Sequence, residues 1–364
     1  MWIFDGGIQA PFSVMRFLMP AVKSTSGTLA RRSACWRRIV LLAVCFLLPT
    51  AYCLLLSLPL HAARGLYEVR EVKPNVFVWI ANDVRDFQGD PQFNRAGTSG
   101  FIITSEGVVV VDTTNSPFHA RELLYEIRQR TELPVRYIIN TSADGDRMLG
   151  NEVFVDQQAT LLATSRARAE MRQYQRELAG RLADDFQLPV RMRGIHPALP
   201  TQTFEGKMVL RLGGQEIKLE SWLGPGPLTA QAVVYVPGAK VLFLGALYEN
   251  GFVPRVGKKD VQRWIEILRQ VETWDVEVCV PRRGPPGSKQ DVTNFRRFLE
   301  WLVQEVANRL QAGKSVDEVK GELLSLPNFP RGGRDLAPAA VEAVYEQLAG
   351  APQALPVSGK SAEH

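Results

Sequence analysis

The sequence predicts an α+β protein built as a four-layer αββα sandwich, with an N-terminal leader and a C-terminal helical extension. Two observations carry this prediction. Apolar runs of strand length are followed by a helical pattern, and the same order of strands and then a helix occurs a second time. The longer predicted helices also carry one apolar stripe each, so each has a single face to bury against a sheet. The chain has 364 residues, of which 46% are hydrophobic and 22% charged, and it can therefore bury one large core or two smaller ones.

Residues 1–63 are predicted to be a signal peptide or a membrane anchor, because basic residues precede a long uncharged apolar run that ends at Ala63. The run exceeds the apolar stretch of a usual cleaved signal, which favours an anchor. However, Pro49 and Pro59 interrupt it, and Ala62 with Ala63 forms a weak cleavage site. Both alternatives stay open. In either case we expect the body to be exported, to the periplasm or another extracytoplasmic space, with or without membrane attachment through this segment.

The leader also accounts for the net charge. Residues 1–38 contain six Lys or Arg and one Asp, a net charge of +5, and the whole chain has 43 Lys or Arg against 38 Asp or Glu, again +5. The remainder is therefore neutral overall. The sequence pI of about 9.0 gives no support to nucleic-acid binding, and no nucleic-acid partner is predicted.

The body is strand-rich from Tyr67 onward. In its first half, apolar and β-branched runs predict strands at 75–80, 99–104, 107–113, 135–140 and 159–164. Helical patterns predict helices at 118–130 and 165–186. The second of these helices is polar and Arg-rich, with Met171, Leu178 and Leu182 on one side. We therefore expect it to lie exposed on the surface.

The second half repeats the pattern. Strands are predicted at 207–212, 215–223, 232–237, 240–245 and 276–281. Helices are predicted at 259–273, 290–312, 315–326 and 337–349. The predicted organisation is therefore a leader over 1–63, a sandwich domain over 64–312, and a helical extension with a polar tail over 313–364.

Four blocks of the body, in this order, resemble the metallo-β-lactamase fold superfamily: "SGFIITSEGVVVVDTT", "YIINTSADGDRMLGN", "VVYVPGAKVLFLGALYENG" and "VCVPRRGPP". The resemblance covers about residues 67–312. It implies the αββα sandwich, and it implies a hydrolase in which a His-x-His-x-Asp-His loop provides most ligands for one or two zinc ions. Zinc bound in this way lowers the pKa of its water and generates hydroxide.

This chain departs from that pattern at nearly every ligand position. The resemblance places Ser142, Asp144, Asp146, Arg147, Pro227, Ala246 and Arg283 where the family has its metal-binding residues. Of the usual ligand set only Asp146 persists. The chain has four histidines, His61, His119, His196 and His364, and they are too scattered in the sequence to form a cluster. The sequence therefore predicts a degenerate site with no metal, no cofactor and no catalytic residues.

Two interpretations of the degenerate site stay open. In one, Asp144 and Asp146 neutralise Arg147 and Arg283, and these ion pairs replace the metal as a structural clamp, so that Arg283→Ala destabilises the fold. In the other, Arg147 and Arg283, with Arg282 nearby, hold a carboxylate or phosphate. A calcium or magnesium site at Asp144 and Asp146 is disfavoured because Arg147 repels a cation.

Several neighbouring residues are interpreted as framework. Asp112, at the end of a predicted strand, is expected to orient the loop, and Asn140, Thr141, Gly150 and Asn151 are expected to serve turns and helix caps. The sequence thus favours an exported protein with a binding or assembly role, whose partner is an unknown protein or a small anionic ligand. The alternative is a hydrolase of the superfamily that uses a non-standard acidic site, so whether the chain is an enzyme stays open.

Overall fold

The computed structural model describes residues 67–82, 96–181, 195–223 and 230–350, all within a unit that spans Ala63–His364. The predicted leader, residues 1–63, and the predicted site residue Pro227 lie outside these ranges. Within them, no helix combines the length and the apolar composition that a membrane crossing requires.

Seven strands form the first sheet, in the order of the sequence. They are β1 (Tyr67–Lys73), β2 (Val76–Ala81), β3 (Ser99–Ile103), β4 (Val108–Val111), β5 (Val135–Ile139), β6 (Thr160–Thr164) and β7 (Gln202–Phe204). The strands from β1 to β4 pair antiparallel, and those from β4 to β7 pair parallel. The carboxyl ends of β4, β5 and β6 therefore lie at one edge of the sheet.

Five strands form the second sheet, in the order β12-β11-β10-β9-β8. They are β8 (Lys207–Leu212), β9 (Gln215–Leu223), β10 (Ala230–Val236), β11 (Val241–Gly245) and β12 (Val278–Pro281). Only β11 and β12 pair parallel. A short 3-10 helix, η3 (Pro237–Ala239), connects β10 to β11.

The core of the sandwich lies between the two sheets. Because side chains alternate along a strand, Val109 and Val111 of β4 pack in this core, together with Val234 and Phe243 of the second sheet. Val108 and Val110 pack on the opposite face, against helices α2 (Pro117–Arg128) and α4 (Asn151–Val155). Burial on both faces explains why β4 consists entirely of valine.

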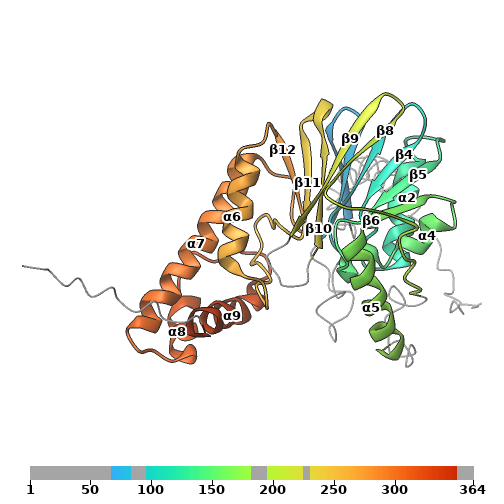
Figure 1. Cartoon of the computed structure of the whole chain (residues 1–364). Helices are drawn as coiled ribbons and strands as arrows, with labels where there is room; N and C mark the ends of the chain where they lie inside the picture. The colour runs from blue at the N-terminus through green and yellow to red at the C-terminus, as the bar shows by residue number, and fades with distance from the viewer. Residues whose placement is uncertain (1–66, 83–95, 182–194, 224–229, 351–364) are drawn as a thin grey trace, which may run out of the picture. The chain divides into compact units, whose positions relative to one another are not determined.

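Helices α6 (Val261–Glu272) and α7 (Lys289–Gln311) cover the outer face of the second sheet (Figure 1). Trp264 and Leu268 of α6 and Phe295 and Leu299 of α7 pack there with Leu242 of β11. The layers are thus helix, sheet, sheet and helix. The predicted αββα sandwich is confirmed.

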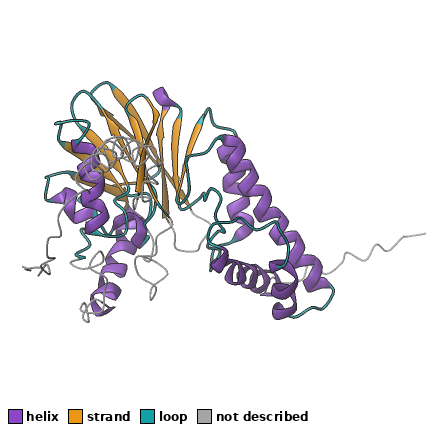
Figure 2. Ribbon diagram, turned by 180° about the vertical axis from the view of Figure 1, so that it is seen from behind, coloured by secondary structure: helices purple, strands orange, loops and turns teal. Residues whose placement is uncertain are grey.

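The C-terminal helices pack on the far half of α7 (Figure 2). They are α8 (Val316–Leu324), η4 (Arg334–Leu336) and α9 (Ala337–Gly350). Leu302 and Val306 of α7 share a core with Val319 and Val344. One 23-residue helix therefore serves both the sandwich and the extension.

Two further helices belong to the first half of the body: the short α3 (Gly145–Met148), which precedes α4, and the longer α5 (Ser165–Arg181). Met171 and Leu178 of α5 are buried against Met148 of α3. Helix α5 lies against α3, since a Cβ added to Gly145 would lie 2.6 Å from the Tyr174 hydroxyl of α5.

Candidate functional site

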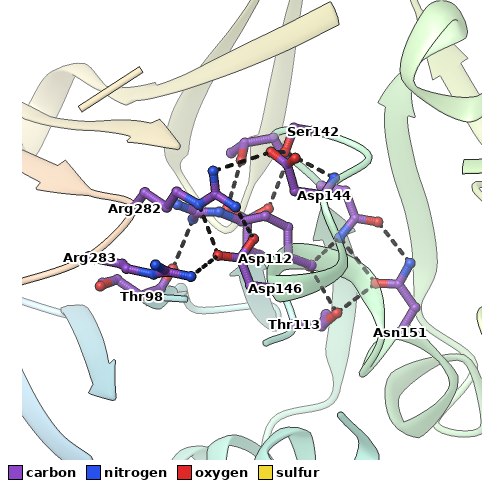
Figure 3. Close-up of polar contacts among 12 residues, drawn as sticks. Thr98, Asp112, Thr113, Ser142, Asp144, Asp146, Asn151, Arg282 and Arg283 are labelled. Carbon is purple, nitrogen blue, oxygen red and sulfur yellow. Dashed lines mark hydrogen bonds and ion pairs between the residues drawn. The ribbon is translucent and has the colours of Figure 1, made fainter. Parts of the chain in front are cut away.

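The residues of the predicted site gather where strands end. Asp112 follows β4, the loop 140–151 follows β5, Ala246 follows β11, and Arg282 follows β12. Since β4 and β5 run parallel, and β11 and β12 also run parallel, the carboxyl ends of each pair bring these segments together. Figure 3 shows the polar contacts among them.

Amide and hydroxyl groups hold both ends of the loop 140–151. Asn140 and Asn151 each donate from their side-chain nitrogen to the other's oxygen, at 3.1 and 2.9 Å, and Asn140 also donates to the carbonyl of Arg147 at 3.0 Å. The Thr113 hydroxyl donates to the Asn151 oxygen at 2.7 Å (Figure 3). All these groups are buried, so each hydrogen bond replaces one lost to water.

Asp112 and Arg147 form the first buried ion pair of the site. Arg147 Nη1 lies 2.7 Å from Asp112 Oδ2 and donates a second hydrogen bond to the carbonyl of Thr98. Asp112 also accepts from the Thr141 amide and hydroxyl, both at 2.8 Å. Burial raises the pKa of the Asp112 carboxyl, and the charge of Arg147 and the hydrogen bonds from Thr141 oppose that rise.

Asp146 lies at the centre of the second group. Arg282 Nε donates to Asp146 Oδ2 at 2.8 Å and Arg282 Nη2 donates to Oδ1 at 2.9 Å, which is the bidentate geometry of a strong guanidinium–carboxylate pair. Arg283 Nη2 reaches the same Oδ2 at 3.3 Å. Burial alone raises the pKa of Asp146, but the charges of Arg282, Arg283 and Arg147 outweigh it and hold the pKa well below its ordinary value.

Asp144 differs from Asp146 because its side chain is 39% exposed. It accepts a hydrogen bond from the Ser142 hydroxyl at 2.9 Å, and its Oδ2 lies 3.9 Å from Arg282 Nη1. Burial raises the pKa of Asp144 and Arg282 lowers it, with a net lowering. The other predicted positions contribute no charge there: Ala246 is buried, and Pro227 lies outside the described residues.

The ion pairs agree only in part with the predicted pairing. The prediction assigned Asp144 and Asp146 to Arg147 and Arg283. The contact of Asp146 with Arg283 is present, whereas Arg147 pairs with Asp112 and the main partner of Asp146 is Arg282. The pairing follows from the positions of the two arginines. Arg147 lies in α3 and its side chain extends to Asp112 at the end of β4, whereas Arg282 directly follows β12 and lies opposite Asp146. The Arg282 main chain is fixed on both sides, because its N–H donates to Tyr248 and its carbonyl accepts from Thr98.

These contacts decide whether a metal fits. In the described ranges, no group of three or more His, Cys, Asp or Glu side chains has the arrangement of a metal site. The carboxylate of Asp146, the one residue retained from the family's ligand set, has both oxygens engaged by guanidinium groups. The described residues of this site therefore do not fit a zinc ion.

Three further charged residues lie beside the site and were missed by the sequence interpretation. Glu249, Arg255 and Lys259 come from the segment between β11 and α6, and their charges act on Arg282 or Asp144. The only signal was the position of charged residues in "YENGFVPRVGKK", which begins two residues after Ala246. Charged residues in a connection are usually solvated, so that signal is weak.

The profile of the Metallo-beta-lactamase superfamily matches residues 93–283, which is 191 of the 364 residues. The chain belongs to the metallo-β-lactamase superfamily. This metallo-β-lactamase-fold chain is 23% identical over 259 residues to a protein named linear primary-alkylsulfatase from Pseudomonas sp. (strain ATCC 19151), covering 61% of this chain and 48% of that protein. The chain thus spans about half the length of that curated relative.

Solved structures agree on the fold. A metallo-β-lactamase from Pontibacter korlensis superposes with a TM-score of 0.51 at 20% identity, covering 64% of this chain and 99% of that one. The inverting sec-alkylsulfatase Pisa1 from Pseudomonas sp. superposes with a TM-score of 0.59 at 16% identity, covering 82% of this chain and 52% of that one. At such low identities these similarities establish architecture alone.

Proposed function

We propose that this member of the superfamily is not a metal-dependent hydrolase, and that a buried ion-pair clamp stands in place of the metal centre. The clamp consists of Asp112, Asp146, Arg147, Arg282 and Arg283. Its role is to keep the loop 140–151 in place, while the protein functions by binding or assembly. The observation that carries the proposal is the engagement of both Asp146 oxygens by Arg282.

Energetics support this role for the clamp. Each side chain of the clamp is at most 5% exposed, so each charge has lost most of its contact with water. Removing one partner from such a pair leaves an uncompensated buried charge, which costs about 3–5 kcal/mol. A zinc ion entering beside Asp146 would displace Arg282 and meet three guanidinium groups. The clamp therefore opposes metal binding by both occupancy and charge.

The second candidate is a hydrolase that uses the acidic loop, and the exposure of Asp144 is the observation in its favour. A general base needs a pKa near the working pH. The pKa of Asp144 is instead lowered from its ordinary value, with Arg282 opposing the effect of burial. Asp144 is thus a weak base, and the non-catalytic role has the stronger support.

The test uses the full chain, equilibrated with zinc and then freed of excess metal by dialysis. We expect elemental analysis to find far less than one zinc ion per chain. We also expect no turnover of lactam, thioester, phosphodiester or alkyl sulfate substrates above the rate of the Asp144→Asn variant. Stoichiometric zinc accompanied by turnover would overturn the proposal. Turnover without zinc that Asp144→Asn abolishes would establish the acidic-site hydrolase.

A further inference from the structure

We propose that Arg255 and Lys259, beside Arg282, form a binding site for a small oxyanion that carries a single negative charge. The inference deepens the binding role under "Proposed function" and rests on the clamp being free of metal. It assigns a chemical class of ligand to residues outside the family's ligand positions.

Unsatisfied donors are the first observation. Lys259 Nζ and Arg255 Nε are both buried, and within the described ranges neither has an acceptor at hydrogen-bonding distance. Lys259 Nζ lies 4.2 Å from the ring centroid of Trp264, and this cation–π contact satisfies only one side of the ammonium group. Buried donors are normally paired, so these N–H groups are available for oxygen acceptors of a ligand.

Charge balance is the second observation. The clamp and its neighbours contain five cationic side chains, Arg147, Arg255, Lys259, Arg282 and Arg283. They contain four carboxylates, Asp112, Asp144, Asp146 and Glu249. Counted over the described residues alone, five positive against four negative charges leave one positive charge uncompensated in a largely buried cluster. One monovalent anion would neutralise the cluster, whereas a divalent anion would reverse the imbalance.

The position of the uncompensated charge follows from the pairing. Arg147 is matched by Asp112, and Arg282 and Arg283 share Asp146, with Asp144 also near Arg282. Burial, with a further contribution from Arg282, lowers the pKa of Lys259 to about 8. Burial, with Arg282 and Arg283, likewise lowers the pKa of Arg255 to about 10. Both side chains thus lie where a further negative charge would be favourable.

The donor chemistry selects an oxyanion. Guanidinium and ammonium groups bind carboxylate, sulfate and phosphate oxygens through short charge-assisted hydrogen bonds. Glu249 Oε2 is also buried and has no donor within the described residues. Glu249 therefore favours a ligand with a single negative charge, because the carboxylates of Glu249 and Asp144 would both repel a second one.

The experiment measures the unfolding midpoint of the full chain against rising concentrations of sodium acetate and sodium methyl sulfate, with sodium chloride at equal ionic strength as reference. A ligand that binds only the native state raises the midpoint in a saturable manner. The two probes distinguish a planar carboxylate from a tetrahedral monoester. Sodium sulfate, which has the same oxygens as methyl sulfate but two charges, should be the weaker ligand.

The matched variants are Lys259→Met and Lys258→Met, because Lys258 is the adjacent lysine and is exposed. We expect Lys259→Met to weaken the response to the better probe by about tenfold or more, and Lys258→Met to leave it unchanged. Arg255→Gln provides the same comparison if Lys259→Met does not fold. Equal responses of the Lys258 and Lys259 variants, or no saturable response in the parent chain, would overturn the anion site. Failure of the anion site would show in the unfolding midpoints, whereas failure of the clamp would show as bound zinc with turnover. The two failures are therefore distinguishable.

Discussion

Arg282 grips both carboxylate oxygens of Asp146, while Arg283 reaches only one of them and at the longer distance of 3.3 Å. The two adjacent arginines should therefore differ in their contribution to stability. We expect Arg282→Ala to lower the free energy of unfolding by about 3–5 kcal/mol and Arg283→Ala to lower it by less, as measured by urea denaturation. Arg263→Ala, in an exposed pair with Glu266, should cost less than about 1 kcal/mol. Equal losses for Arg282 and Arg283 would contradict the bidentate pairing.

Asp146 should also shape the dependence of stability on pH. Its pKa in the folded chain lies below the ordinary value of 3.8. Its contribution is therefore fully present above pH values near 3.8 and is lost as the pH falls below that value. We expect Asp146→Asn to be less stable near neutral pH and to show a flatter loss of stability between about pH 5 and 2. Urea denaturation across this range measures both effects, and an unchanged slope would contradict the ion pair.

Gly245 is required at the end of β11 for two reasons. Its φ is +53°, and a Cβ there would lie 2.5 Å from the Thr141 hydroxyl that donates to Asp112. We expect Gly245→Ala to destabilise the chain by about 2 kcal/mol or more. The control is Gly321→Ala in α8, where a Cβ meets no atom within 4 Å. That change should instead stabilise by up to about 1 kcal/mol, because alanine favours a helix.

An engineered zinc site should bind the metal more tightly when the clamp is opened. The variant Ser142→His with Asp144→His places two imidazoles beside Asp146, which together would provide three zinc ligands. With Arg282 in place we expect weak zinc binding, and adding Arg282→Ala should strengthen it by about tenfold or more. Competition with a chromophoric chelator measures the affinity. The same affinity with and without Arg282 would show that this arginine does not oppose the metal.

Much of the fold was predictable because the spacing of apolar residues along the sequence indicates which face of a helix or strand is buried. The stripe of Trp264, Ile265 and Leu268 placed α6, and the valine run placed β4. The three-residue β7 and the short helices α3 and α4 were missed, since elements of three to five residues carry too little pattern. The seven-residue β1 was not assigned either, because this exposed edge strand, YEVREVK, is rich in charged residues.

The site was predictable only in part. The resemblance brought the segments of Asp146 and Arg283 together, and these two side chains are in contact, yet charge alone does not say that Arg282 is the main partner of Asp146. Asp146 and Arg282 are 136 residues apart, and Asp112 and Arg147 are 35 apart. Their pairing depends on the exact exit direction of each strand. Glu249, Arg255 and Lys259 were missed because charged residues in a connection are usually solvated.

The mutual amide contacts of Asn140 and Asn151, completed by the Thr113 hydroxyl, fasten the loop from the side of the first sheet. The opposite side, where Ser142 and Asp144 lie, takes no part in that attachment. We therefore expect single substitutions of Ser142 or Asp144 to leave the fold intact, because other residues attach the loop to the first sheet. The residues that hold the loop in its conformation are thus different from Ser142 and Asp144 on its opposite side. These two positions are therefore suitable for redesign.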